Sequence, residues 1–305
     1  MSNKEKNKTQ HLIVVDDETM GKLRKLQLEM LDAFVKICKD HDLTYFLVGG
    51  TALGAIRHKG YIPWDDDVDV GMLRPDYDKF REIAPKELPP TMFYQSMKTD
   101  PNYTTYVEKI RYNNSIAMQT EVKHMDIHHG VWLDVFPFDG CPDCPKEEAK
   151  KRKKAILYSR AHGIDAIVKA PKNQNFKMQF QGFLLRIYKT IIGKKRLHRK
   201  LNKLFYQHSV EDSKYVTYLL GRNDKPVSKE LYVSPDNKTG TAMFCGKEYS
   251  VPYKIEAYLT SRYNDYMTLP PIEKQVSHHA VEYYKFPDDI KDEADTIKQN
   301  QSRRK

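Results

Sequence analysis

Residues 47–70, LVGGTALGAIRHKGYIPWDDDVDV, are the stretch that decides the fold. Four aspartates fall within five residues here, at Asp65, Asp66, Asp67 and Asp69, with apolar residues on both sides. In an extended strand, side chains two residues apart share a face, so Asp67 and Asp69 are expected to project together. Asp65 joins them if the strand reaches back to it, whereas Asp66 is expected to point away and to be dispensable.

Carboxylates that share one face repel each other unless a cation lies among them. Mg²⁺ suits such a site because it takes oxygen ligands from carboxylates and from substrate phosphates, and Mn²⁺ is the alternative. A solvated acidic turn is the competing interpretation. A further acid, Asp134, lies alone inside the apolar run VWLDVF. A buried carboxylate is costly unless it is paired or metal-bound, so Asp134 is either a further ligand or a structural hydrogen-bonding residue.

Two glycines, Gly49 and Gly50, close an apolar run and precede a helix predicted from Thr51 to Gly60, with Thr51 as its N-cap. Glycines at such a junction let the backbone approach a phosphate, and the helix N-terminus supplies N–H donors. The stretch does not match a Walker A loop, because Ala55 and Ile56 follow Gly54.

The order of predicted elements indicates an α/β (α+β) fold with a mixed sheet. Hydrophobic spacing predicts helices over 20–43, 74–88 and 255–267, and strands over 44–50, 61–73, 91–97, 106–120 and 130–140. These elements would form a core of about 120 residues with flanking helices. The predicted division is a tail (1–18), a catalytic core (19–145), a basic helical segment (146–207), a C-terminal part that completes the domain (208–290) and a second tail (291–305).

Composition excludes a membrane-spanning protein. Of the 305 residues, 40% are hydrophobic and 30% are charged, and no run approaches the roughly 18 apolar residues of a spanning helix. The first apolar run, Leu12–Val15, is shorter than the roughly 7–15 residues of a signal peptide, so a cytoplasmic location is expected. Four cysteines are too few for a disulfide scaffold, and the pair in CPDCP is predicted to be a turn.

The net charge of +10 is concentrated in one segment. Residues 146–203 contain 18 Lys or Arg and 3 Asp or Glu. This segment is either a nucleic-acid surface, a membrane-binding amphipathic helix or a solvated helical face. It contains no nucleic-acid-binding motif, so no nucleic-acid partner is expected. The hypothesis is that Phe176–Lys203 helps to dock the protein on the anionic inner face of the cell membrane.

Several long motifs resemble the LicD family of phosphocholine transferases and, beyond it, fukutin-related enzymes. They are GGTALGAIRHKGYIPWDDDVDVGMLRPDYDKF, KIRYNN, GVWLDVFPFDG and YNDYMTLPP followed by His279. The chain departs from the family at Asn264, where glycine is frequent. The resemblance implies the nucleotidyltransferase fold of DNA polymerase β-like enzymes. It also implies Mg²⁺-dependent transfer of phosphocholine from CDP-choline to a hydroxyl of a lipid-linked, cell-surface glycan precursor, of teichoic acid or lipopolysaccharide type.

By this resemblance, Asp65, Asp67, Asp69 and Asp134 hold the metal, and Asp134 also helps to deprotonate the acceptor hydroxyl. Transfer of another phospho-alcohol, or nucleotide transfer from an NTP, stays open as an alternative. Other residues are expected to bind the substrate. They are the backbone of Gly49, Gly50 and Thr51, the cationic or phosphate-contacting side chains of Arg57, His58, Lys109 and Arg111, and the aromatic face of Trp64, to which Tyr61 and Trp132 are alternatives.

Overall fold

The structure is a computed structural model that describes residues 15–164, 176–221, 225–277 and 279–289. Most of the two predicted tails, 1–18 and 291–305, therefore lies outside the described residues. Within the described part, no helix is both long enough and apolar enough to cross a membrane.

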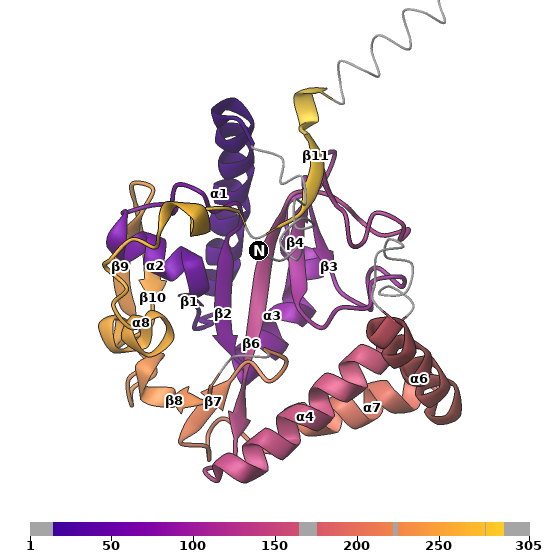
Figure 1. Cartoon of the computed structure of the whole chain (residues 1–305). Helices are drawn as coiled ribbons and strands as arrows, with labels where there is room; N and C mark the ends of the chain where they lie inside the picture. Colours follow the sequence, from indigo (N-terminus) through magenta and orange to yellow (C-terminus); the bar gives the residue numbers. More distant parts are fainter. Residues whose placement is uncertain (1–14, 165–175, 222–224, 278, 290–305) are drawn as a thin grey trace, which may run out of the picture.

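A mixed sheet forms the centre of the molecule (Figure 1), which confirms the predicted α/β class. Its central strands are ordered β1-β2-β6-β4-β3, with β2 and β6 parallel and the other neighbours antiparallel. Strand β7 extends the far half of β6 and pairs in turn with β8. The strands of this sheet are β1 (Phe46–Leu47), β2 (Asp69–Leu73), β3 (Met92–Gln95), β4 (Glu108–Tyr112), β6 (Trp132–Cys141), β7 (Tyr215–Thr217) and β8 (Val227–Ser228).

Two helices pack against this sheet, and smaller elements complete the fold. Helices α1 (Asp17–Asp40) and α3 (Arg74–Glu87) bury apolar side chains such as Leu31, Phe34 and Phe80 in the main core. Beside the β1 edge of the sheet lie α2 (Gly49–Arg57), the hairpin of β9 (Gly240–Phe244) and β10 (Lys247–Val251), and α8 (Ile255–Tyr263). The remaining elements are β5 (Ile116–Gln119), which pairs with β11 (Val281–Lys285), and the 3-10 helices η1 (Lys229–Leu231) and η2 (Ile272–Lys274).

The basic segment forms a group of helices beside the sheet (Figure 1), as its composition predicts. It contains α4 (Pro145–His162), α6 (Phe176–Ile192) and α7 (Lys194–Phe205). A small apolar cluster that includes Ala155, Leu201 and Phe205 holds α4 and α7 together. The buried guanidinium of Arg74 joins this group to the core, because it pairs with Asp139 and lies over the ring of Phe205.

Three local predictions were wrong. The strand predicted over 61–73 begins only at Asp69, since Arg24 and Gln27 of α1 donate to the backbone carbonyls of residues 62–66 in place of a neighbouring strand. Thr51 does not cap α2, which begins at Gly49. Its hydroxyl accepts a hydrogen bond from the Asp69 N–H at 2.9 Å. The helix predicted over 255–267 ends at Tyr263.

The residue that follows this helix, Asn264, has φ 56° and ψ −111°, a conformation that glycine adopts most readily. We expect Asn264→Gly to stabilise the protein by about 1 kcal/mol and to raise the Tm by about 2 °C in a thermal melt. Asn237→Gly is the matched control. Asn237 also has a positive φ, of 57°, but its side chain donates to Thr44 Oγ1 at 2.8 Å, so glycine there loses a hydrogen bond. An equal gain at both positions would contradict the explanation.

Candidate active site

Two acids and one lysine lie in register across the centre of the sheet. Asp69, the first residue of β2, is paired with Asp134 of β6, and Asp134 is paired with Lys109 of β4. Residues in register on neighbouring strands project to the same face. The Lys109 ammonium forms an ion pair with Asp134 Oδ1, and the Trp132 indole donates to Asp134 Oδ2 at 3.0 Å. Both oxygens of Asp134 are therefore held in place.

Asp67 joins this pair from the segment that enters β2. Asp67, Asp69 and Asp134 each offer one carboxylate oxygen, and the three oxygens lie within 4.8 Å of one another. The predicted proximity of Asp67 and Asp69 therefore agrees with the structure, although Asp67 precedes the strand. Asp65 lies beside Asp67 and is 7% exposed, so it also belongs to the cluster.

The Gly-Gly pair is required by the close approach of these acids. A Cβ added at Gly50 would lie 2.4 Å from Asp65 Oδ2, and one at Gly49 would lie 3.0 Å from Asp69 Oδ2. Gly49 also has a φ of +57°, which disfavours any side chain there. Its N–H donates to the Tyr258 hydroxyl at 3.0 Å. The expectation that the Gly49 N–H contacts a phosphate therefore does not agree with the structure, because this donor already has an internal acceptor.

The acids open into a pocket of about 680 Å³, a size typical of small-molecule sites. Asp65, Asp67 and Asp69 line one wall together with Gly50. The lining also includes residues between 263 and 274, from the end of α8 to η2. The pocket also receives a cation and three aromatic rings, which are Arg57, Trp64, Tyr263 and Tyr266. Carboxylates, a cation and aromatic faces therefore share one space.

Burial and crowding raise the pKa of the carboxylates that line the pocket. Burial, with the neighbouring Asp67 charge, raises the pKa of Asp65 to about 8. The pKa of Asp67 is raised by burial and by the charges of Asp66 and Asp134. Burial and the charges of Asp67 and Asp134 raise the pKa of Asp69 well above its usual value. The cluster thus holds more negative charge than its protein surroundings neutralise.

The residues fit a hard divalent cation. Among the described residues, no hydrogen-bond donor reaches the buried Asp69 Oδ1, which is the atom a metal would satisfy. Asp67 and Asp134 supply further oxygens close to it. An all-oxygen donor set of this kind suits Mg²⁺ or Mn²⁺ rather than a thiolate-seeking metal.

A divalent cation should therefore stabilise the protein, and more so at higher pH. The raised pKa values mean that the folded chain binds protons at the cluster more tightly than the unfolded chain does. The stabilisation that comes from this tighter proton binding is complete below about pH 4. It is lost as the pH rises through the raised pKa values, up to about 8 for Asp65. We expect Mg²⁺ or Mn²⁺ to raise the Tm by several degrees at pH 8 and much less at pH 5. Equal increments at both pH values, or an unchanged increment in Asp69→Asn, would contradict the site.

The predicted phosphate-binding cations lie in different places. Arg57 lines the pocket, where its Nε donates to His58 Nε2 and its Nη1 donates to the Tyr266 carbonyl, both at 2.9 Å. His58 lies behind Arg57 and holds it. Lys109 lies against Asp134, where burial lowers the pKa of its ammonium while the Asp134 charge raises it.

The position of Arg111 in the structure does not agree with its predicted role as a phosphate contact. It is 1% exposed and donates to Gln95 Oε1 and the Gly130 carbonyl, both at 2.7 Å. Among the alternative aromatic residues, Trp132 is buried beneath the acids, and Tyr61 packs on Phe244 and Arg24. Trp64 is the predicted aromatic residue that lines the pocket.

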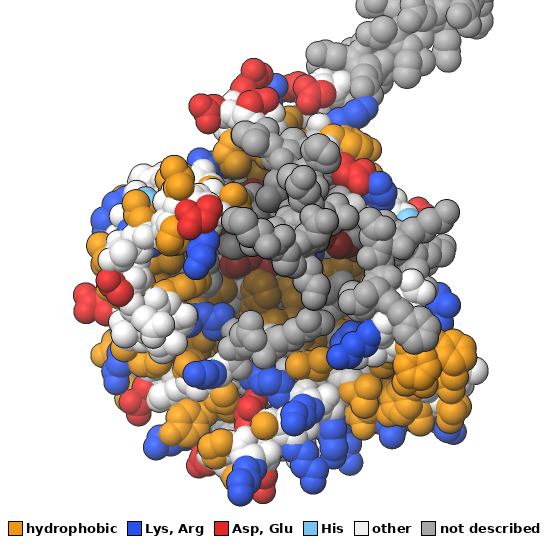
Figure 2. Space-filling view, viewed as in Figure 1, with side chains coloured by type: hydrophobic (Ala, Val, Ile, Leu, Met, Phe, Trp, Pro, Cys, Tyr) orange, Lys and Arg blue, Asp and Glu red, His pale blue; other side chains and the backbone are white. Residues whose placement is uncertain are grey.

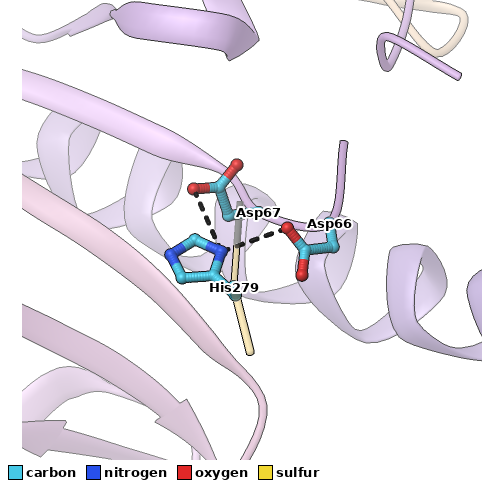
Figure 3. Close-up of side chains that lie close together, drawn as sticks. All are labelled: Asp66, Asp67 and His279. Atoms are coloured by element: carbon cyan, nitrogen blue, oxygen red, sulfur yellow. Dashed lines mark hydrogen bonds and ion pairs between the residues drawn. The ribbon is translucent and has the colours of Figure 1, made fainter. Parts of the chain in front are cut away.

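Asp66, which was predicted to point away from the other acids and to be dispensable, has a partner in the structure. It is 1% exposed, and its Oδ1 lies 3.1 Å from His279 Nδ1, which is also 3.8 Å from Asp67 Oδ2 (Figure 3). Burial lowers the pKa of His279, but the hydrogen bond to Asp66 and the charges of Asp67, Asp66 and Asp134 together raise it. We name this contact the Asp66–His279 clasp. It ties the chain after η2 to the acidic segment.

Sequence reasoning missed the pocket residues between 263 and 274 and the clasp. Tyr258, Tyr263, Lys274 and His279 all follow residue 255, far from the acidic motif along the chain. One signal was available, since the motif YNDYMTLPP followed by His279 belongs to the stretches that carry the family resemblance.

The paired acids and the glycine junction both fall within a stretch that matches a known family model. Residues 42–162 match the model described as LicD/FKTN/FKRP, nucleotidyltransferase domain. The chain is 28% identical over 289 residues to the lipopolysaccharide cholinephosphotransferase LicD of Haemophilus influenzae, which covers 87% of this chain and 98% of that protein. The chain is thus similar to a LicD protein along most of its length, and residues 42–162 match the family's nucleotidyltransferase domain.

Two shorter similarities fall on parts of the chain. Ribitol-5-phosphate transferase FKTN of Mus musculus is 38% identical over 65 residues, 21% of this chain and 14% of that protein. An uncharacterized protein of Rickettsia typhi is 44% identical over 46 residues, 15% of each chain.

Proposed function

We propose that the protein transfers phosphocholine from CDP-choline to a hydroxyl of a lipid-linked, cell-surface glycan precursor and releases CMP. The observation that carries this proposal is that aspartates, the cations Arg57 and Lys274 and three aromatic rings line one pocket. The similarity to a cholinephosphotransferase along almost the whole of both chains supports the choice of donor. The glycan would be of teichoic acid or lipopolysaccharide type. The transfer reaction would take place on the cytoplasmic side of the membrane.

The acids would hold the metal, and the pocket walls would hold the donor. Asp67, Asp69 and Asp134 offer the oxygens for a Mg²⁺ or Mn²⁺ ion, with Asp65 beside them. When bound, such an ion neutralises the diphosphate and stabilises the CMP leaving group. Arg57, which also lines the pocket, would contact a phosphate oxygen. Lys109 would keep Asp134 oriented and partly neutralised.

The choline head group carries a positive charge without a hydrogen-bond donor. Aromatic faces bind such a group by cation–π attraction of about 0.5–2 kcal/mol per contact. Trp64, Tyr263 and Tyr266 all line the pocket that the acids also line. We propose that these rings hold the choline, with Trp64 as the residue that the sequence already indicates.

The acceptor hydroxyl must lose its proton during transfer. Asp134 is poorly suited to take it, because Lys109 and Trp132 occupy its two oxygens. Asp65 faces the pocket and has a raised pKa, which suits a group that accepts a proton near neutral pH. We therefore assign the proton-accepting role to Asp65 and the ligand role to Asp134.

A donor screen tests the proposal. The full chain is incubated with Mg²⁺, a glycan acceptor and one of CDP-choline, CDP-glycerol or CDP-ribitol, and CMP release is measured. CMP release from CDP-choline that depends on the acceptor is the expected result. A chain that instead labels the acceptor with nucleotide from an NTP, and releases pyrophosphate, is a true nucleotidyltransferase and would overturn the proposal.

Ribitol phosphate is the second candidate for the transferred group. The similarity to a ribitol-5-phosphate transferase favours it, although that similarity covers 21% of this chain. The two candidates differ in charge at the head group, since ribitol is neutral and choline is cationic. Trp64→Leu should therefore raise the KM for CDP-choline by about tenfold and leave a ribitol donor less affected.

The domain division is also a proposal. Residues 19–145 and 208–290 would form one catalytic unit, because both contribute walls to the same pocket. Residues 146–207 would be a separate functional segment, since none of its described residues, 146–164 and 176–207, lines that pocket.

A further inference from the structure

Helix α6 presents a row of large apolar side chains to solvent. Phe183, Leu184, Ile187 and Ile191 are 57%, 48%, 41% and 71% exposed, and their spacing places them along one side of the helix. Phe180, one turn earlier, is 52% exposed. Figure 2 shows hydrophobic side chains gathered where α6 lies in Figure 1, at the lower right. An exposed row of this kind marks an interaction surface.

The charges around this row have a single sign. Residues 176–205, which span α6 and α7, contain nine Lys or Arg and no Asp or Glu. Arg186 of α6 and Lys200 of α7 are among the exposed cations. The surface is thus apolar along one line and cationic beside it, which complements an apolar layer bordered by negative charge.

A cationic cavity lies at the start of α7, directly after the end of α6. Its volume is about 540 Å³, and its lining includes Lys194, Lys195, His198, Arg199 and, from α4, His162. No acidic residue lines this cavity. The exposed, positively charged side chains of Lys194, Lys195 and Arg199 around one cavity suit the binding of a phosphate group.

We propose that α6 and the start of α7 form a docking surface for an anionic lipid bilayer. The apolar row of α6 inserts among the acyl chains, and the cavity around Lys194, Lys195 and Arg199 receives a lipid phosphate. Basic amphipathic helices bind membranes by this combination of apolar burial and attraction to anionic lipids. The inference goes beyond the proposed function, because it concerns residues outside the catalytic pocket and requires no particular donor.

Two other occupants fit the surface less well. A nucleic acid would use the cations, but it offers nothing apolar for Phe183 or Ile191 to pack against. A second copy of the chain would bury the apolar row, but it would also bring two cationic surfaces together. An anionic bilayer satisfies both features at once.

Flotation of the full chain with lipid vesicles tests the proposal. One set of vesicles contains phosphatidylcholine alone, and the other also contains phosphatidylglycerol, each at low salt and at about 0.5 M salt, where charges are strongly screened. We expect binding to the anionic vesicles that salt weakens. Lys194→Gln/Lys195→Gln/Arg199→Gln should lower the partition coefficient about 100-fold, at roughly fivefold per charge. Phe183→Gln/Ile187→Gln should lower it about tenfold or more.

The matched control removes the same three charges elsewhere. Lys25, Lys39 and Lys86 are exposed on α1 and α3, so Lys25→Gln/Lys39→Gln/Lys86→Gln should bind vesicles within about twofold of the parent, because those charges lie away from the docking surface. Equal binding to neutral and anionic vesicles, no binding to either, or equal losses in the control and the cavity variant would overturn the proposal. So would self-association in sedimentation that requires Phe183 and Ile187. The vesicles contain no donor or acceptor, so none of these outcomes depends on the proposed activity.

Discussion

Asp69→Asn is expected to lower the transfer rate about 1000-fold, equivalent to about 4 kcal/mol of transition-state stabilisation. Asp69 is in register with Asp134, and its buried Oδ1 is the atom that the described residues leave without a donor. Asparagine keeps the size of the side chain but removes the charge that holds a cation. CMP release under saturating donor and Mg²⁺ is the measurement.

The same variant should melt at a higher temperature than the parent when no cation is present. Removing one of several crowded, buried carboxylates relieves repulsion, so activity and stability move in opposite directions. Asp126→Asn is the matched control, because Asp126 is exposed and lies outside the pocket lining. Near-normal transfer by Asp69→Asn, or a lower melting temperature without cation, would show that Asp69 is a structural residue.

His279→Ala is expected to destabilise the protein by about 3 kcal/mol and to lower the Tm by roughly 6 °C. The substitution leaves the fully buried Asp66 without its partner, and buried charges are costly when unpaired. It also releases the chain that follows η2. The residues just before this chain, which include Leu269, Pro270 and Lys274, line the pocket. The KM for the donor should therefore rise about tenfold, with a smaller change in kcat.

A double-mutant cycle separates the clasp from a general loss of packing. Asp66→Asn should restore part of the stability that His279→Ala removes, giving a coupling of about 1–2 kcal/mol. His41→Ala is the matched control, since His41 makes a similar contact with Glu87 at 2.7 Å but on the surface, where such pairs contribute less than about 1 kcal/mol. Additive effects of the two clasp substitutions would refute the clasp.

The acidic cluster was predictable because it depends on short-range rules. Alternation along a strand placed Asp67 and Asp69 on one side, and the cost of burying Asp134 indicated that it needs a partner. The register that brings Asp134 opposite Asp69 follows from a parallel pairing between strands that are far apart in sequence, which the local pattern does not encode. The sequence therefore indicated the members of the cluster, and the sheet supplied their arrangement.

The errors arose where a distant element overrides the local pattern. The segment before Asp69 reads as a strand, but side chains of α1 bind its carbonyls, so it follows another path. Asp66 was predicted to have no role because its partner, His279, lies 213 residues away in the sequence. Arg111 reads as an exposed strand cation, but it is buried on Gln95 and the Gly130 carbonyl.

The clasp has a consequence for how the protein is made. The acids at 65–69 and 134 emerge from the ribosome long before the segment 263–274 and His279. Until then, the pocket lacks the residues of this segment, and Asp66 lacks its partner. The catalytic pocket is thus completed at the end of synthesis, and a chain that stops short of His279 would contain every acidic residue of the site without an enclosed place to use them.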